Sequence, residues 1–157
     1  MVVSELEVLS EAERDLVLRA PALITVLISG ADGDFDKDEE LHASKAVHYK
    51  SVQGDPLLME YYQAIDLDFL SAMRHLHQKY SGTPQERAEK ITAKLTQLND
   101  ILPKLHHRFA RALINDWRNL AKTVARASGG IFGFASISFE ESHFVDLEMI
   151  TFQPPAL

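Results

Sequence analysis

Apolar residues recur three and four positions apart along most of the chain, which is the spacing of one face of an α-helix. The pattern is clearest over residues 57–80 and 104–127, where we predict two long helices. Further helices are predicted over 10–18, 22–29, 37–51, 84–102 and 139–150. The strict alternation of apolar and polar residues that indicates strands is nearly absent. We therefore predict an all-α protein of six to eight helices, with residues 1–157 forming a single compact domain.

Capping residues and prolines mark where these helices begin and end. Ser10 and Glu13 have the spacing of a capping box, and Thr83 followed by Pro84 is a strong helix start. Pro21 has no N–H to donate, so we expect it to break or kink the first helix, or to lie in the first turn of a second one. Residues 22–29 are apolar almost all round, which predicts a central, buried helix.

Composition narrows the class of protein. The chain is 46% hydrophobic and 25% charged, as globular proteins are, and it has no cysteine. The lack of cysteine excludes disulfides, thiol catalysis and thiolate metal sites. The longest apolar stretch, residues 20–28, is far shorter than the ~20 residues that cross a bilayer. With no basic residue among the first ten, we expect no secretory signal and a cytoplasmic location.

The net charge of −7 is unevenly distributed. Residues 72–126 contain eleven lysines and arginines and four acidic residues, while the rest of the chain carries a net charge of −14. A basic stretch can mark a nucleic-acid surface, but this one has few aromatic residues and no recognition motif. We interpret it as the solvated surface of helices and expect no nucleic-acid partner.

Residues 32–40 hold six acidic residues and one lysine. Carboxylates alternating around a glycine could bind a divalent cation such as calcium or magnesium, through four side chains: Asp32, Asp34, Asp36 and Glu39. An EF-hand is excluded, because no glutamate closes the loop at its twelfth position. The alternative is that Asp36 and Glu39 only cap the helix that follows, where the helix dipole favours acidic residues.

A second segment has the same pattern as the start of this helix. Residues 35–39 and 137–141 each place a capping residue after an apolar one, with a glutamate three positions further on. Each segment also follows a Ser-Gly pair. We therefore predict a helix–loop–helix unit that occurs twice and divides the domain into two related halves.

The sequence Ile28-Ser29-Gly30-Ala31-Asp32-Gly33-Asp34-Phe35, followed by Glu39, resembles the signature of TerB-like tellurite-resistance proteins. The late stretch of residues 127–134, with Ile137-Ser138 and Glu140-Glu141, is similar to the second half of that family. The resemblance implies a bacterial, all-helical protein of two related halves, associated with resistance to tellurite and other stress. It also implies that the acidic residues of the first segment contact a metal. The family has no settled biochemical activity.

We expect a non-enzymatic module that binds a divalent cation, a protein partner or both, because reducing tellurite usually needs thiols or a redox cofactor. The alternative is a di-metal enzyme or metal carrier. Two Glu-x-x-His pairs, Glu39/His42 and Glu140/His143, have the spacing found in di-iron helical bundles, and Glu60 is the best additional carboxylate. Both pairs lie in the first turn of a predicted helix, which argues against a site in the middle of a bundle.

Residues 129–135 combine three glycines with three large apolar residues: Ile131, Phe132 and Phe134. Glycines make such a loop costly to order. Three large apolar side chains in it therefore indicate either a role in the core or a role in binding. One interpretation is that they fold back and fill the core between the two halves. The other is that at least one phenylalanine is exposed and mediates self-association, or contacts a protein partner or a small apolar ligand.

Overall fold

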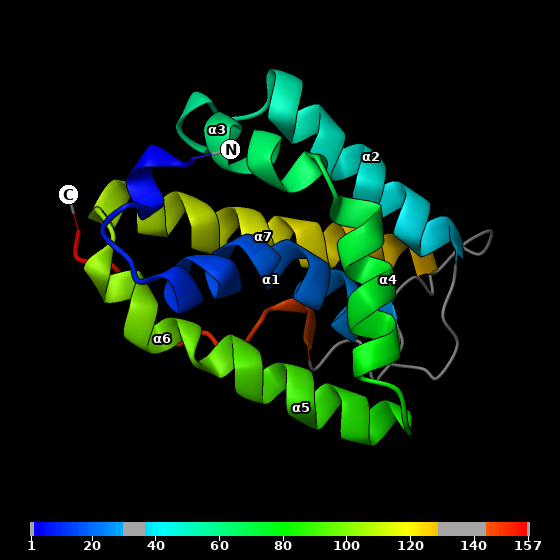
Figure 1. The fold of residues 1–157 in the computed structure, drawn as a ribbon. Coiled ribbons are helices and arrows are strands. Elements are labelled where there is room, and N and C mark those ends of the chain that lie inside the picture. The colour runs from blue at the N-terminus through cyan, green and yellow to red at the C-terminus, as the bar shows by residue number, and fades with distance from the viewer. Residues whose placement is uncertain (1, 30–36, 129–143, 157) are drawn as a thin grey trace.

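The structure is a computed structural model that describes residues 2–29, 37–128 and 144–156. Within these ranges it is helical and contains no strand, which confirms the predicted all-α class (Figure 1). The α-helices are α1 (Glu11–Ser29), α2 (Lys37–Gln53), α3 (Pro56–Asp66), α4 (Phe69–Lys79), α5 (Pro84–Thr96), α6 (Leu98–Ile101) and α7 (His107–Ser128). Two short 3-10 helices are η1 (Ser4–Leu6) and η2 (Leu102–Lys104). No helix of the described ranges is long and apolar enough to cross a membrane.

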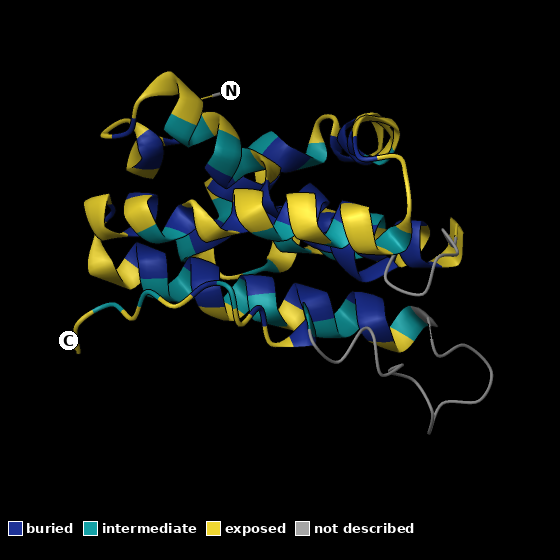
Figure 2. Cartoon of the chain, turned by 90° about the horizontal axis from the view of Figure 1, so that it is seen from below, coloured by how far each residue is buried: buried dark blue, intermediate teal, exposed yellow. Residues whose placement is uncertain are grey.

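Helix α1 lies at the centre of the molecule. It packs beside α7, with α5 on one side and α4 crossing its end, while α2 and α3 cover α7 from the other side (Figure 1). Every α1 residue from 20 to 29 is buried, which confirms the predicted central, buried position of residues 22–29 but not their forming a separate helix. The outer helices have their buried positions on the inward side and their exposed positions on the outward side (Figure 2).

Pro21 neither breaks α1 nor begins a second helix, because it lies inside one continuous helix. The expected break and the expected second helix start were therefore wrong. A proline at position 21 leaves the Val17 carbonyl without its usual helical donor. The Tyr61 hydroxyl, on α3, donates to that carbonyl at 2.7 Å and replaces the missing bond. The Trp117 indole N–H in turn donates to the Tyr61 oxygen at 3.1 Å. Tertiary structure thus satisfies the carbonyl that the proline leaves unpaired.

The helix predicted over residues 57–80 is two helices, α3 and α4, which meet at a corner formed by Leu67 and Asp68. The apolar spacing continues through the corner, from Ile65 to Phe69, so periodicity alone could not show it. The two halves pack on different neighbours, because α3 lies mainly on α2 and α7 whereas α4 lies mainly on α1. The chain turns where these two packing surfaces diverge.

Two other predicted boundaries also differ. The helix expected over 84–102 ends at Thr96, and α6 and η2 follow as separate short turns. Helix α7 begins at His107, three residues later than expected. The helix expected over 139–150 does not extend through its described part, because residues 146–149 form turns and Leu147 has a φ of 49°. The segments of the proposed repeat lie mostly outside the described residues.

The capping predictions at Ser10 and Thr83 are confirmed. The Glu13 N–H donates to the Ser10 hydroxyl at 3.2 Å, and the Ser10 N–H donates to a Glu13 carboxylate oxygen at 2.9 Å, which completes a capping box. The Thr83 hydroxyl accepts from the Glu86 N–H at 3.1 Å, ahead of Pro84 at the first helical position. Local sequence therefore determines these two helix starts.

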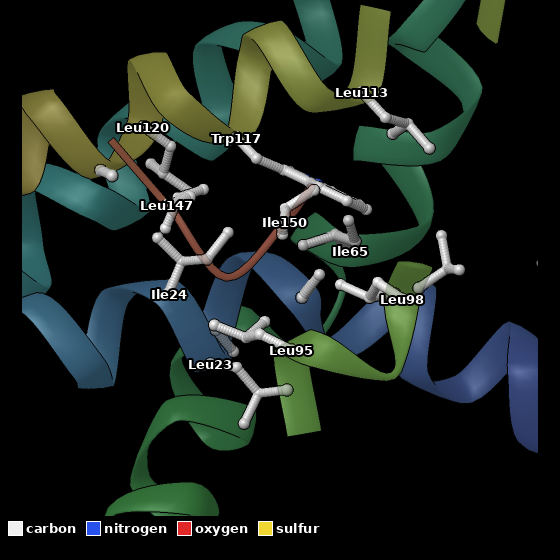
Figure 3. Close-up of a cluster of buried hydrophobic side chains, with 14 of the residues drawn as sticks. Leu23, Ile24, Ile65, Leu95, Leu98, Leu113, Trp117, Leu120, Leu147 and Ile150 are labelled. Atoms are coloured by element: carbon white, nitrogen blue, oxygen red, sulfur yellow. The ribbon is translucent and has the colours of Figure 1, made fainter. Parts of the chain in front are cut away.

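The C-terminal segment, residues 144–156, lies across one apolar face of the bundle. Three of its side chains are buried, Val145, Leu147 and Ile150. Figure 3 shows the last two in a cluster with residues from α1, α5, α6 and α7, namely Leu23, Ile24, Leu95, Leu98, Trp117 and Leu120. The segment has the form of a strap that closes this face of the core.

Polar side chains hold the backbone of this strap. Asn99 donates to the Met149 carbonyl at 2.8 Å, and its own oxygen accepts from the N–H groups of residues 151 and 152 at 2.8 and 3.0 Å. Arg118 donates to the carbonyls of Asp146 and Ile150 at 3.1 and 3.2 Å. Arg111 donates to the carbonyls of residues 154 and 155 at 3.1 and 2.5 Å. The expectation that the basic stretch is only a solvated surface is therefore wrong for these two arginines.

Candidate functional site

A groove opens on the face of the molecule formed by α2 and the corner between α3 and α4. Its volume is about 830 Å³, and its walls come from residues 44–53 on one side and residues 66–74 on the other. Four large apolar side chains line it and remain exposed: Tyr49 (59%), Val52 (56%), Leu67 (72%) and Leu70 (41%). The described surface has only three other exposed large apolar residues, Val2, Val8 and Leu41. Exposed apolar side chains gathered around a concave surface are typical of binding sites.

Two contacts between the walls show how the walls face each other. His48 on α2 lies 2.8 Å from the carboxylate of Asp66 at the end of α3. Arg74 on α4 lies 3.7 Å from the carboxylate of Glu40, one turn into α2. Position 40 faces position 74, and position 48 faces position 66. The two walls therefore run antiparallel.

Leu41 and Tyr49 are apolar residues of the helix predicted over 37–51, and the structure leaves both side chains exposed. Helix α2 has two apolar faces. Ala43 and Val47 are four residues apart and buried. Tyr49 follows Leu41 by eight residues, and Val52 follows Tyr49 by three. These spacings place the three side chains together on a different side of the helix. This second face was the signal in the sequence that could have indicated the groove.

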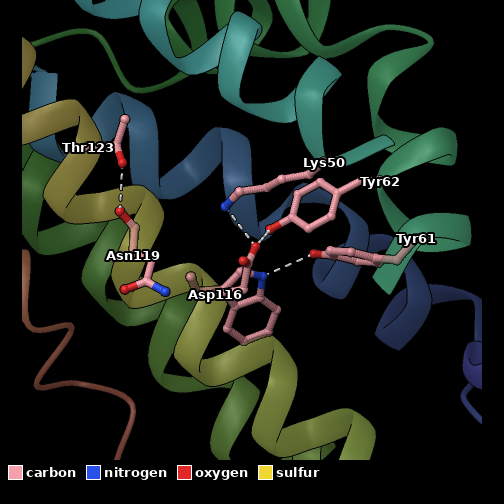
Figure 4. A network of polar contacts seen from close by, with 7 residues as sticks. Lys50, Tyr61, Tyr62, Asp116, Asn119 and Thr123 are labelled. Carbon is pink, nitrogen blue, oxygen red and sulfur yellow. Dashed lines mark hydrogen bonds and ion pairs between the residues drawn. The ribbon is translucent and has the colours of Figure 1, made fainter. Parts of the chain in front are cut away.

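A polar network lies between α2, α3 and α7 (Figure 4). The Lys50 ammonium is 2.8 Å from an Asp116 carboxylate oxygen, and the Tyr62 hydroxyl donates to the same oxygen. The Lys50 nitrogen also lies 5.2 Å from the centre of the Tyr62 ring. The Lys50 and Asp116 side chains are only 17% and 20% exposed, so each largely desolvated charge has its partner beside it.

Burial determines the protonation of the two tyrosines in this region. Desolvation raises the pKa of Tyr61 well above its ordinary value, against the smaller lowering effect of the Trp117 N–H. Desolvation, reinforced by the negative charge of Asp116, also raises the pKa of Tyr62 well above its ordinary value. Both hydroxyls therefore stay protonated at neutral pH and act as hydrogen-bond donors. The network joins three helices and supplies no free general base.

The predicted cation ligands are only partly described. Asp32, Asp34 and Asp36 lie outside the described residues. Glu39 lies in the first turn of α2 and is 2% exposed. Its neighbour Glu40 is also buried and faces Arg74.

The alternative di-metal site can be examined only at its first pair, because Glu140 and His143 lie outside the described residues. His42 is exposed, and its Nδ1 is 2.8 Å from the Asp38 carbonyl, while Glu39 is buried, so this pair does not converge. The residues that the structure describes contain no group of three or more histidines and acids that could hold a metal.

Glu60, the additional carboxylate proposed for the di-metal site, has a different partner. It accepts from the Ser4 N–H at 2.5 Å and from the Ser4 hydroxyl at 2.9 Å. These bonds, the backbone one first, lower its pKa. Glu60 therefore fastens η1 to α3.

The glycine-rich segment that we expected to contain interaction residues also lies outside the described ranges. Its candidate residues are Ile131, Phe132 and Phe134. Whether they fill the core or contact a partner therefore stays a prediction.

Comparison with protein-family models, with curated proteins and with solved structures gives no match. The TerB-like resemblance therefore rests on the two sequence segments alone.

Proposed function

We propose that this chain is a non-enzymatic helical module that binds an amphipathic helix of a protein partner in the groove between α2 and α4. One observation carries the proposal: four large apolar side chains, Tyr49, Val52, Leu67 and Leu70, are exposed around one groove. Binding would remove them from water, at roughly 25 cal/mol for each Å² of apolar surface buried.

The shape and length of the groove favour a helix as the bound element. Its α2 wall extends from Ser44 to Gln53, which at 1.5 Å per residue is about 13 Å. Apolar residues at positions i, i+3, i+4 and i+7 of a bound helix span about 10 Å, so two helical turns fit the wall. A concave site with apolar walls is the usual way to receive such a stripe.

The TerB-like resemblance supports a role in resistance to tellurite and other stress, in the bacterial cytoplasm. In this proposal the protein acts by bringing a partner into place, since the chain has no cysteine for thiol chemistry. The stress association rests on the resemblance, and the binding activity rests on the groove.

A second proposal is that the acidic segment binds calcium or magnesium through Asp32, Asp34, Asp36 and Glu39. The carboxylates that alternate around Gly33 in the sequence, and the TerB-like resemblance, support this proposal. The test compares the wild type with an Asp32→Asn, Asp34→Asn double variant by thermal melting in calcium, in magnesium and in chelator. A cation-dependent rise in Tm that the variant loses supports the site. Equal Tm values in all conditions would show that the segment is only a helix cap.

The groove is tested with a synthetic amphipathic peptide of about 18 residues, with one leucine stripe and neutral polar residues elsewhere. We expect fluorescence anisotropy to detect binding. A Val52→Glu, Leu67→Glu variant should weaken it by about tenfold or more, because charged side chains would stand in the apolar contact. A Val2→Glu, Val8→Glu variant is the matched control, since both residues are exposed and neither lines the groove. Absence of binding, or equal binding by the groove variant, would contradict the proposal.

A further inference from the structure

A small pocket lies on another part of the surface, where α4 and α5 both pack on α1 (Figure 1). Its volume is about 280 Å³, and we call it the α5 pocket. It shares no lining residue with the groove between α2 and α4. The side chains that line it are of two kinds. The apolar ones are Ala12, Leu16, Leu23 and Leu76, and the polar ones are Asp15, Arg19, Lys79, Tyr80 and Lys94.

The three cationic side chains of the α5 pocket have no acidic partner. Arg19, Lys79 and Lys94 are exposed, and none of them forms an ion pair with a residue that the structure describes. Lys50 and Lys104 differ in this respect, since they lie 2.8 and 2.5 Å from a carboxylate. Unpaired positive charges around a concave surface with apolar walls raise the local concentration of anions.

One acidic residue, Asp15, lines the same pocket. It lies one turn before Arg19 on α1, but the two side chains form no ion pair. Three cations and one carboxylate leave the pocket with a net charge of +2, whereas the whole chain carries −7. The pocket therefore favours an anion, and the Asp15 carboxylate opposes its binding.

Tyr80 provides a second, independent observation that points to a ligand. It is only 7% exposed, and its hydroxyl makes no hydrogen bond to the residues that the structure describes. Burial raises the pKa of this hydroxyl above its ordinary value, so it is a donor at neutral pH. A hydroxyl in a largely buried side chain normally has a partner, and this one lines a pocket in which a ligand can supply it.

The surroundings of Tyr80 hold its side chain and backbone in place. The Lys79 ammonium lies 5.6 Å from the centre of the Tyr80 ring, within the range of a cation–π interaction. The Arg87 side chain donates to the Tyr80 carbonyl at 3.1 Å and fixes the backbone at the end of α4. The donor is therefore positioned before any ligand binds.

The size and charge of the pocket define the class of ligand. A cavity of about 150 Å³ holds a benzene ring. The 280 Å³ of this pocket therefore suit one ring or a short aliphatic group together with one anionic group. A phosphate monoester carries close to two negative charges at neutral pH, and its oxygens accept from guanidinium, ammonium and hydroxyl groups.

We propose that the α5 pocket binds a phosphate monoester of a small apolar molecule. The phosphate lies among Arg19, Lys79 and Lys94 and accepts a hydrogen bond from the Tyr80 hydroxyl. The apolar part of the ligand packs on the leucines of the pocket. This site does not depend on the proposed function, because the groove and the pocket have no residue in common.

Isothermal titration calorimetry of the full chain with phenyl phosphate tests the proposal. We expect phenyl phosphate to bind about tenfold or more tightly than phenol or inorganic phosphate, and its advantage over phenol should fall as ionic strength rises. Sedimentation with vesicles that contain phosphatidic acid identifies the source of the phosphate. Binding above that to phosphatidylcholine vesicles indicates a lipid headgroup, and its absence together with phenyl phosphate binding indicates a soluble ligand.

Two cation variants test the charge assignment. Lys79→Gln, Lys94→Gln should weaken phenyl phosphate binding by about tenfold or more, because two charge-assisted hydrogen bonds are lost. Lys45→Gln, Arg108→Gln is the matched control, since both residues are exposed and neither lines the pocket. It changes the net charge equally and should keep the Kd within about twofold.

Two single variants test the hydroxyl and the sign of the charge effect. Tyr80→Phe should weaken phenyl phosphate binding several-fold and leave phenol binding unchanged, with Tyr49→Phe as its control. Asp15→Asn should tighten phenyl phosphate binding, because it removes the opposing charge.

Circular dichroism and Tm verify that every variant folds. Failure of phenyl phosphate to bind, equal binding of phenol, or equal loss in the Lys45→Gln, Arg108→Gln control would overturn the proposal. None of these results would affect peptide binding in the groove.

Discussion

The molecule has two apolar faces that differ in whether a segment of the chain covers them. On the face formed by α1, α5, α6 and α7, the chain's own residues 144–156 cover the apolar surface (Figure 3). On the face formed by α2 and the corner of α3 and α4, the described part of the chain supplies no such cover, and Tyr49, Val52, Leu67 and Leu70 stay exposed.

The difference between the two faces shows what a segment needs in order to cover an apolar face of its own protein. The strap places Leu147 and Ile150 in the core, and Asn99, Arg111 and Arg118 satisfy its backbone groups. The groove is lined by apolar and polar side chains, and its four large apolar residues stay exposed. The first face is adapted to its own chain, and the second has the form of a site for another molecule.

The largest expected effect is the loss of a side chain from the covered face. Ile150→Ala should lower the free energy of unfolding by about 2–5 kcal/mol, because Ile150 is buried and its truncation leaves a cavity in the core. Urea denaturation followed by circular dichroism measures this change. A loss below about 0.5 kcal/mol would mean that the strap is not part of the folded core.

Alkaline pH should act on the network that joins α2, α3 and α7. The pKa of Tyr62 is raised in the folded state, so the unfolded state loses this proton first as pH rises above about 10. The contribution of the protonated tyrosine to the free energy of unfolding is therefore fully present below pH 10. It decreases above pH 10, by about 1.4 kcal/mol at pH 11 for each such tyrosine. Tyr62→Phe should make the decline between pH 9 and pH 11 shallower. Tyr49→Phe, which removes an exposed hydroxyl outside this network, is the control variant.

Removing one strap-binding arginine should have a smaller effect. Arg118→Ala deletes the donors to two carbonyls and should cost about 1–2 kcal/mol, because part of this loss is replaced by water. Hydrogen exchange should show faster exchange in residues 144–152 before it does in α1. Arg108→Ala, on an exposed part of α7, should change neither measurement.

The smallest expected effect on stability is on the open face. Leu67→Ala should change the free energy of unfolding by less than about 0.5 kcal/mol, because the side chain is already in water. The same variant should weaken binding of the amphipathic peptide several-fold. A destabilisation comparable to that of Ile150→Ala would show that Leu67 is covered within the protein itself, and would remove the contrast between the two faces.

The fold class and several helix starts could be predicted from sequence, because they depend on residues that are neighbours along the chain. The three- and four-residue apolar spacing gives helices wherever it occurs. The caps at Ser10 and Thr83 form because their partners are three residues away. The proposed cation ligands Asp32, Asp34 and Asp36 lie outside the described residues, so that part of the sequence prediction remains to be tested.

Tertiary structure decided the features that depend on distant partners. Pro21 lies within an intact helix because Tyr61, far along the sequence, donates to the Val17 carbonyl. The corner at Leu67 forms because α3 and α4 pack on different helices, although the apolar spacing runs through it. Periodicity records that a residue is apolar, but not whether another element of the chain covers it. Coverage depends on how all the helices pack together, and for that reason only the structure could distinguish the face closed by the strap from the open groove.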